Sequence, residues 1–443
     1  EVHVLARRFG SQTLTMPIVA HQLPHADTRL GFAQAAQEKI VQLDLDVVHD
    51  TGCGWCCDVI QPHSGSRRVT AERNVLLAPR FWRPLKRLSN WFSPRYKHFD
   101  QLATRQFSDP DRLYMALSRR VASDLIDRHH VPVDQIRLIY NGVDTDRFTP
   151  AHRVKYRKLI RRRLGLSNKT PLLLVIAHNF RLKGIPTLLR MMARWNDPRR
   201  LHLAVVGGKR IGQYQRMAER LGVGSRVSFV GPVEDTVPFY AAADIYVHPT
   251  FYDPCSLVVL EAMASELPVI TSVQDGTGEL ITDGVEGHVL QDPKDHEALL
   301  EHVRALLPPQ IRQRMGKAAR RLALEHTFDH NVDEIVAVYR EIRELRLLAA
   351  EERFARSKSP FYVRRSAGAE SVEPFYVRRS LGNEPEDQAA SLRRLFSDDQ
   401  VESGGFSIDP TRLERFTVRT TKADEVPAPS ESSSPSPERQ VLS

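Results

Sequence analysis

The chain has 443 residues, 41% of them hydrophobic, which is enough for the cores of two ordinary domains and an appendage. It contains no run of about 18 or more apolar residues and does not open on a hydrophobic secretory segment, so we expect no membrane-spanning helix and no export signal. A formal charge of +9 favours anionic partners such as nucleotides, phosphorylated glycans, anionic lipid or nucleic acid.

The first part of the chain reads as short strands with few helices. Apolar runs predict strands over 2–6, 46–49, 58–61, 114–117 and 136–140, and the pattern over 121–129 predicts a helix. The sequence begins at Glu1, inside the first of these strands and without a Met. We therefore expect a preceding piece to be missing.

Three of the four cysteines, Cys53, Cys56 and Cys57, are crowded together. Together with His63 downstream they would supply the ligands of a zinc site, but the sequence lacks a second Cys-x-x-Cys and a paired His motif. We interpret the cluster as small loop residues. A disulfide framework would be spread along the chain, so a reducing cytosol is the expected compartment.

Aromatic and basic residues interleave between positions 76 and 107. Such a segment would dock on anionic lipid or bind a phosphorylated acceptor. The alternative is a helix whose aromatics pack inward while its cations stay solvated. The residues concerned are Arg80, Phe81, Trp82, Arg83, Lys86, Arg87, Trp91, Phe92, Arg95, Tyr96, Lys97 and Phe99.

Beyond the turn at Asn141-Gly142, where we place a hinge between domains, strands and helices alternate. We expect the basic block at 153–163 to be a solvated helix. Fully apolar strands covered by helices on both faces imply a parallel, doubly wound sheet. The predicted strands cover 172–177, 201–206, 227–230, 245–248 and 268–271, and helices are predicted over 185–194 and 213–221.

The carboxyl ends of these strands carry candidate site residues. Arg181, Lys183 and Lys209 follow strands, as does Asp253, which leads through Ser256 into an amphipathic helix. Ser256 is the expected N-cap, and Leu257 belongs to the expected apolar face. Unpaired amides at the start of this helix would hold a phosphate, and Glu261, one turn deeper, would accept the hydroxyls of a ribose. The alternative is an ordinary capped core helix.

Two further segments complete the chain. Residues 326–352 are expected to be helical, with apolar residues on one face. Beyond Ser357 the composition turns to Ser, Pro, Glu and Arg, which predicts a disordered tail. The heptapeptide Pro-Phe-Tyr-Val-Arg-Arg-Ser occurs at 360–366 and again at 374–380, which marks it as a candidate contact for a partner or a membrane.

An ordered succession of motifs then resembles a known family. It includes Asn141-Gly-Val-Asp144, Arg181-Leu-Lys-Gly184, Val205-Val-Gly-Gly208, Asp253-x₇-Glu261 and Gly278-Glu279. Together they are similar to retaining glycosyltransferases of family 4, and nearest to the lipopolysaccharide-core glucosyltransferase type. The resemblance covers most of residues 1–345. It implies the GT-B fold, two Rossmann-like domains at 1–145 and 146–325 facing a cleft, followed by a crossover helix at 326–356 and the tail at 357–443.

The resemblance also implies roles for single residues. Arg181, Lys209 and Lys183 would take the charge of the departing diphosphate, Asp253 would contact the donor sugar, and Glu261 would bind the ribose. The backbone of Cys255, Ser256 and Leu257 would line the diphosphate beside Gly207. His63 would orient the sugar or handle the acceptor proton. The family usually has Glu where Asp253 stands, which is one methylene longer.

The implied activity is metal-independent transfer of a hexose from a nucleotide-diphosphate sugar to a glycan or glycolipid, in cell-envelope or lipopolysaccharide synthesis. No cofactor is expected, and two Asp-x-Asp pairs, at 44–46 and 144–146, are rejected as a metal site. We expect a cytoplasmic protein, peripheral at the membrane face.

Two readings from other classes stay open. The first is a non-catalytic nucleotide-sugar-binding or scaffold protein, because the first strand and Gly-rich loop of the family are not found before Glu1. The second and weaker reading is a basic nucleic-acid binder, for which no recognised module is present in the sequence.

Overall fold

The computed structural model describes residues 1–9, 18–23, 28–197, 200–208 and 211–357. Three parallel sheets are found in this part of the chain. A two-stranded sheet pairs β1 (His3–Ala6) with β2 (Val19–Gln22), and a four-stranded sheet follows in chain order: β3 (His49–Asp50), β4 (Val59–Ile60), β5 (Leu113–Ala116) and β6 (Ile136–Leu138).

The third sheet has six parallel strands in the order β12-β11-β10-β7-β8-β9. Counted from the first strand of this half, the order is 3-2-1-4-5-6, which is the doubly wound arrangement with its reversal between β7 and β10. The strands are β7 (Leu172–Ile176), β8 (His202–Val206), β9 (Val227–Gly231), β10 (Ile245–Val247), β11 (Val269–Ser272) and β12 (Gly287–Leu290). The predicted parallel, doubly wound sheet is confirmed.

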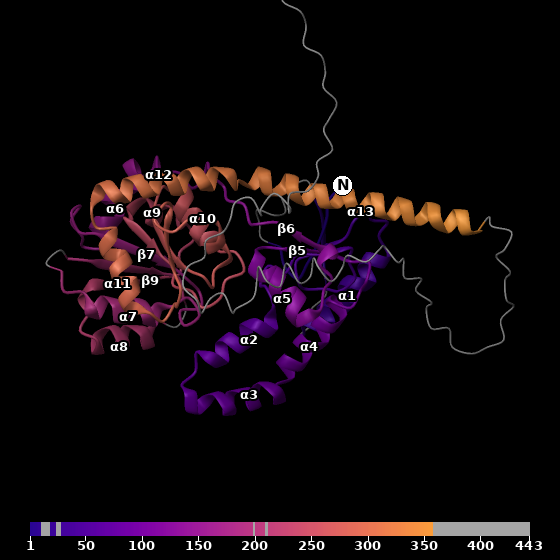
Figure 1. Ribbon diagram of the computed structural model, residues 1–443, viewed down its shortest axis with the longest axis horizontal. Helices are drawn as coiled ribbons and strands as arrows, with labels where there is room; N and C mark the ends of the chain where they lie inside the picture. Colours follow the sequence, from indigo (N-terminus) through magenta and orange to yellow (C-terminus); the bar gives the residue numbers. More distant parts are fainter. Residues whose placement is uncertain (10–17, 24–27, 198–199, 209–210, 358–443) are drawn as a thin grey trace, which may run out of the picture. The chain divides into compact units, whose positions relative to one another are not determined.

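Helices cover both faces of this sheet (Figure 1). One face packs against α7 (Ile185–Arg194), α8 (Gly212–Arg220) and α11 (His296–Ala305). The other packs against α6 (His152–Arg163), α9 (Val237–Ala242), α10 (Leu257–Ala264) and α12 (Pro309–Glu325). The inner strands β7, β8, β10 and β11 are buried along almost their whole length and are mainly apolar, which is why they can be recognised without alternation. The edge strands β9 and β12 are partly exposed, and β12 was not predicted.

The helices of the first half surround the four-stranded sheet and extend beyond it. They are α1 (Arg29–Val41), α2 (Arg67–Leu76), α3 (Arg83–Phe92), α4 (Pro94–Gln106) and α5 (Arg119–His129). Helix α5 matches the prediction at its carboxyl end and begins two residues earlier, where Ser118 Oγ accepts from the Val121 N–H at 3.2 Å. No helix of the described residues is long and apolar enough to cross a membrane.

The last helix, α13 (Phe328–Ser357), packs on the four-stranded sheet although it follows the second half in the chain. Val338 and Ile342 are buried against Val59, Leu113, Met115 and Ile139. The Tyr339 hydroxyl lies 2.7 Å from Nδ1 of His49, and Arg137 forms an ion pair with Glu341. The predicted tail and its repeated heptapeptide lie outside the described residues.

Two expectations from the sequence are wrong in detail. The strand expected over 46–49 is β3, which begins only at His49, because the carbonyl of Asp46 accepts from the Arg346 guanidinium instead of a neighbouring strand. The block at 153–163 is a helix, α6, but it is not solvated throughout. Arg161 is 1% exposed and, with Arg157, binds Asp244. The two guanidinium groups outweigh the effect of burial and lower the pKa of that carboxyl.

For the basic-aromatic segment two alternatives were open. Around α3 the aromatic side chains do not pack inward: Phe81 is 75% exposed, Trp91 76% and Phe92 71%. Leu85 and Leu88 on α3 are also more than half exposed. The inward-packed alternative is therefore excluded for this helix, which presents an apolar surface beside its cations.

Candidate functional site

The loops that follow β7 and β10 meet at the point where the strand order reverses. Lys183 Nζ lies 2.5 Å from Oδ2 of Asp253 and 3.2 Å from the carbonyl oxygen of Tyr252. Both charged side chains are mostly buried, with 19% and 15% of their surface exposed. Ligands of doubly wound sheets bind at this edge, beyond the carboxyl ends of the strands at the reversal point. Two residues predicted for the site are thus brought together.

His248 completes the polar contacts of Asp253. Its Nε2 lies 3.3 Å from Oδ2 of Asp253 and 3.4 Å from the hydroxyl of Ser256. Burial lowers the pKa of His248, so the imidazole is neutral near pH 7 and donates a hydrogen bond. Burial alone would raise the pKa of Asp253, but the Lys183 charge and the His248 hydrogen bond bring it below its usual range. Asp253 is therefore an ionised carboxylate with a fixed orientation.

A second carboxyl group, Asp275, lies directly behind this cluster. It is completely buried, and its segment forms an isolated parallel bridge with Asp253. Oδ2 accepts from the Thr271 hydroxyl at 2.7 Å, and Oδ1 accepts from the backbone N–H groups of Ser256 at 3.2 Å and Thr277 at 3.1 Å. Burial and then the charge of Asp253 raise the pKa of Asp275 to about 8. Near neutral pH the pair therefore holds one proton, on Asp275.

Glu261 lies on the second turn of α10 and is oriented by a single contact. The Tyr240 hydroxyl donates to its Oε2 at 2.7 Å, while burial raises the pKa of the carboxyl. Among the described residues no protein group hydrogen-bonds to Oε1. Glu261 is partly exposed, so Oε1 is open to a ligand. This geometry favours a carboxylate that is available to accept hydroxyl hydrogens.

Ser256 occupies the N-cap position of α10, as predicted. Its hydroxyl makes no capping hydrogen bond, and the carboxyl of Asp275 accepts from the Ser256 N–H. Leu257 is 45% exposed, so its predicted packing in the core is wrong. An exposed Leu257 leaves the first turn of the helix accessible.

Cys255 is buried at the same helix start. Its carbonyl accepts from Nδ2 of Asn141 at 2.8 Å, and its Sγ lies 3.5 Å from Oγ1 of Thr277. Burial raises the pKa of the thiol to about 12, so Cys255 stays protonated. These contacts fix the backbone of the loop between Asp253 and α10.

Two glycines allow close approach of the backbone around the site. Gly184, at the start of α7, has φ of +76°, and an added Cβ would lie 2.1 Å from the Pro249 carbonyl oxygen. Gly207, after β8, has φ of +95°, and a Cβ there would lie 2.3 Å from the carbonyl oxygen of Ala177. Both positions require glycine, because a side chain would push apart the loops that carry the site.

Arg181 does not join the Lys183–Asp253 cluster. Its guanidinium donates to the carbonyl of Leu77 at the end of α2. Lys209, the other cation predicted for the site, lies outside the described residues. Lys183 is therefore the cation that the described structure brings against Asp253.

His63 lies in a loop that reaches the Asp253 loop. Two residues further on, a Cβ on Gly65 would lie 2.1 Å from the Tyr252 hydroxyl, and the Ser66 N–H donates to the same hydroxyl at 3.1 Å. The His63 ring itself makes no hydrogen bond with the described residues. Its loop therefore borders the site.

The cysteine cluster shows no metal-ligand geometry. Cys53, Cys56 and Cys57 are free thiols, and burial raises the pKa of Cys56 and of Cys57. In the described part of the chain no group of three or more His, Cys, Asp or Glu side chains is arranged to hold a metal ion. The Asp144 carboxylate accepts from the N–H groups of Asp146 and Arg147, which is a turn contact.

Sequence reasoning did not find Asp275, His248 and Tyr240. Asp275 precedes a glycine at the end of a strand, where an aspartate usually signals a turn, and nothing in the local pattern reveals that it lies behind Asp253. His248 and Tyr240 belong to apolar runs. A polar residue near a strand end can be assigned to the site only when the position of the neighbouring strand in the sheet is known.

Comparison with known proteins identifies the family. The family model "Glycosyltransferase Family 4" matches residues 1–147, and "Glycosyl transferases group 1" matches residues 157–322. The chain is 32% identical over 250 residues to the D-inositol 3-phosphate glycosyltransferase of Salinispora arenicola, covering 53% of this chain and 55% of the relative. It is 28% identical over 234 residues to the lipopolysaccharide glucosyltransferase WaaG of Escherichia coli, covering 52% and 62%. The matches thus span little more than half the length of these relatives.

The fold is also that of solved glycosyltransferases. The crystal structure of WaaG superposes with a TM-score of 0.62 at 23% identity, covering 76% of this chain and 90% of that one. Anabaena Alr3699/HepE, solved in complex with UDP-glucose, superposes with a TM-score of 0.52 at 18% identity, covering 77% and 90%. These likenesses confirm the GT-B fold. With the two adjoining family matches, they show that the chain belongs to the group 1, family 4 glycosyltransferases.

Proposed function

We propose that the chain is a retaining glycosyltransferase that moves a hexose from a nucleotide-diphosphate sugar to a glycan or glycolipid acceptor. The observation that carries the proposal is the buried Lys183–Asp253 ion pair beside the start of α10, with Glu261 one turn deeper. A cation, an oriented carboxylate and a helix N-terminus at a strand-order reversal are the groups that a diphosphate and its sugar require.

The donor's diphosphate would lie at the first turn of α10. There the backbone amides and the Lys183 ammonium stabilise negative charge as the phosphate departs, without a metal ion. Lys183 pairs with Asp253, so a diphosphate competes for the same ammonium and frees the Asp253 carboxylate for the hydroxyls of the sugar. Arg181 and Lys209 would add positive charge from the neighbouring loops, and Gly207 would let the backbone approach.

Glu261 would accept both hydroxyls of the ribose through the oxygen that Tyr240 leaves open. The backbone of Cys255, Ser256 and Leu257 lies between Glu261 and Asp253, where the diphosphate would connect ribose and sugar. His63, on the loop that touches Tyr252, would orient the sugar or take the proton of the acceptor hydroxyl. The proposed order along the site is therefore ribose, diphosphate, sugar, acceptor.

We place the acceptor among cell-envelope glycans or glycolipids, including those of lipopolysaccharide. The names of the relatives support this choice, because one acts on lipopolysaccharide and another on an inositol phosphate. Trp91 and Phe92 are among the exposed apolar side chains of α3. They support the proposal that the protein binds to the cytoplasmic face of a membrane.

A panel of UDP-, ADP- and GDP-hexoses tests the proposal. The full chain is incubated with each donor, and both its melting temperature and the release of nucleoside diphosphate are recorded. A donor at a hundredfold excess over Kd should stabilise the folded chain by about 2.7 kcal/mol. Stabilisation with release is the expected result. Stabilisation without release, even with envelope glycolipid extract added as acceptor, would contradict catalysis and leave the non-catalytic nucleotide-sugar-binding alternative.

A further inference from the structure

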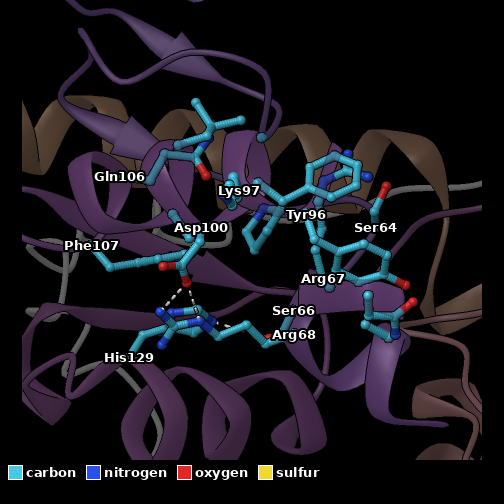
Figure 2. Close-up of a pocket in the computed structure, with 18 of the residues that line it drawn as sticks. Ser64, Ser66, Arg67, Arg68, Tyr96, Lys97, Asp100, Gln106, Phe107 and His129 are labelled. Carbon is cyan, nitrogen blue, oxygen red and sulfur yellow. Dashed lines mark hydrogen bonds and ion pairs between the residues drawn. The ribbon is translucent and has the colours of Figure 1, made fainter. Parts of the chain in front are cut away.

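A cavity of about 440 Å³ lies in the first half of the chain, between the start of α2 and the helices α3 and α4. Figure 2 shows Ser64, Arg67, Tyr96 and Lys97 around it. Its volume falls in the range of small-molecule sites, roughly 300–1,000 Å³. No residue lining it has a role in donor binding as proposed above.

The charges that line the cavity are mainly positive. Four cations, Arg67, Arg68, Arg87 and Lys97, face a single carboxylate, Asp100. Asp100 is already paired with Arg68, and the pair is visible in Figure 2. His129 also lines the cavity, but burial lowers its pKa to about 4, so it carries no charge near pH 7. The excess positive charge selects an anionic ligand.

Arg87 and Lys97 are the cations with the fewest competing contacts. Both side chains are exposed, and neither forms an ion pair or a side-chain hydrogen bond with the described residues. Arg67, by comparison, lies over the ring of Phe99 with its Cζ 5.1 Å from the ring centroid. A phosphate group in the cavity would therefore find two uncommitted cations from two different helices, α3 and α4.

Aromatic rings provide the apolar part of the lining. Trp91, Tyr96 and Phe99 line the cavity, and Tyr96 and Phe99 meet edge to face at 6.3 Å between centroids. Flat rings beside uncommitted cations suit a ligand that has an apolar ring face and an anionic group, as a phosphorylated sugar or cyclitol does.

The wall of the cavity is shared with the loop of the donor site. Ser64, Gly65 and Ser66 line the cavity, and the Ser66 N–H donates to the hydroxyl of Tyr252, the neighbour of Asp253. The same hydroxyl donates to Asp124 at 3.1 Å. A ligand in the cavity therefore lies against the segment that contacts the Asp253 loop.

We propose that this cavity binds the phosphorylated sugar or cyclitol of the acceptor, with Arg87 and Lys97 on the phosphate and Trp91 on the ring. The proposal rests on the function proposed above only in naming this ligand the acceptor. The phosphorylated ring has two sources, a soluble sugar phosphate and the headgroup of a glycolipid, and both offer the same chemistry to the cavity.

Calorimetric titration of the full chain tests the proposal without any nucleotide sugar. The ligands are a hexose 6-phosphate, an inositol phosphate, the free hexose and inorganic phosphate. We expect at least one phosphorylated ring to bind, and Arg87→Gln and Lys97→Gln each to weaken it about tenfold. Trp91→Ala should weaken it as well. The controls are Arg80→Gln for the two cation variants and Phe81→Ala for Trp91→Ala. Phe81 matches Trp91 in exposure, at 75% against 76%, and neither Arg80 nor Phe81 lines the cavity.

Vesicles distinguish the two sources. Cavity-dependent binding to phosphatidylinositol vesicles, in excess of binding to phosphatidylglycerol vesicles of equal charge, identifies a lipid headgroup; cavity-dependent binding of the soluble compounds alone identifies a free sugar phosphate. Equal losses in the cavity variants and the controls would overturn the proposal, because they indicate adsorption to the whole basic-aromatic surface. Binding of the free hexose as tight as that of its phosphate, or no binding of any probe, would overturn it too.

The two proposals fail separately. If no nucleotide sugar binds while a phosphorylated ring binds and depends on Arg87 and Lys97, the proposed function fails and the cavity remains a binding site. If nucleotide sugars turn over with an acceptor KM that the cavity variants leave unchanged, the function stands and the assignment of the cavity is wrong.

Discussion

At the scale of residues, the site depends on two neighbouring carboxyl groups of which one is ionised and the other protonated near neutral pH. Asp253 stays ionised because Lys183 and His248 stabilise its charge, whereas Asp275 is protonated near neutral pH because it is buried behind Asp253. Because Asp275 is neutral, the Lys183 ammonium is attracted by one neighbouring carboxylate, Asp253, instead of two. Asp275 also joins the start of α10 to the segment after β11 through the Ser256 and Thr277 amides.

This arrangement predicts a loss of donor affinity in alkaline solution. As the pH rises through about 8, Asp275 ionises beside Asp253, and the second negative charge repels the diphosphate and draws on Lys183. The Kd for a nucleotide sugar should therefore increase between about pH 7 and pH 9. Asp275→Asn keeps an oxygen acceptor but cannot ionise, so its Kd should stay flat over the same range. A variant whose Kd rises in parallel with that of the wild type would refute ionisation of Asp275 as the cause.

At the scale of elements, a glycine allows two loops at the reversal point of the sheet to approach each other closely. Gly184 starts α7 immediately after Lys183, and its backbone passes the Pro249 carbonyl closely enough to exclude a Cβ. The position of the lysine therefore depends on how α7 begins.

Gly184→Ala should destabilise the chain more than Gly165→Ala does. Both glycines have positive φ, +76° and +69°, so each alanine incurs roughly 1–2 kcal/mol of backbone strain. Only at Gly184 would the new Cβ meet backbone, whereas no atom lies within 4 Å at Gly165. Overpacking adds roughly 1–3 kcal/mol, which urea unfolding of the two variants should reveal as their difference. Equal losses of stability would mean that the Gly184–Pro249 approach relaxes freely.

Much of the second half could be predicted from sequence. The strands over 172–176 and 202–206 are continuous apolar runs, and α7 has the bounds predicted for it, because its stripe of buried residues is regular. The first half is less readable because β3 and β4 have only two residues each, too few for any period. The cavity was beyond prediction, because it arises only where α2, α3 and α4 meet.

The sequence names candidate residues but not their contacts. Lys183 and Asp253 follow from polar residues after strand ends and Glu261 from its place on the next helix, yet the sequence does not show that Lys183 and Asp253 form an ion pair. Arg181 was expected in the same place and instead binds the carbonyl of Leu77. The raised pKa of Asp275 depends on its nearness to Asp253, and only the folded chain brings positions 253 and 275 together in a backbone bridge.

At the scale of the whole molecule, the described chain joins a first half that carries the cavity proposed to bind a phosphorylated ring to a second half that carries the proposed donor site. The Tyr252 hydroxyl contacts both Ser66 and Asp124, and Glu279 accepts from the N–H groups of Arg119 and Arg120. Helix α13 adds its own contacts to the four-stranded sheet. The donor loop is thus in direct contact with residues that border the cavity, as transfer between two bound ligands requires.

The central claim is that the carboxyl edge of the six-stranded sheet binds and uses a nucleotide sugar. The most direct measurement is the rate of nucleoside diphosphate release by Glu261→Ala, with Glu219→Ala on the exposed face of α8 as a control and circular dichroism melting as a check of folding. Removing a charged partner of two ribose hydroxyls should lower the rate at limiting donor by roughly a hundredfold, with an unchanged melting curve and a control that matches the wild type. A Glu261→Ala rate equal to that of the wild type would contradict the account.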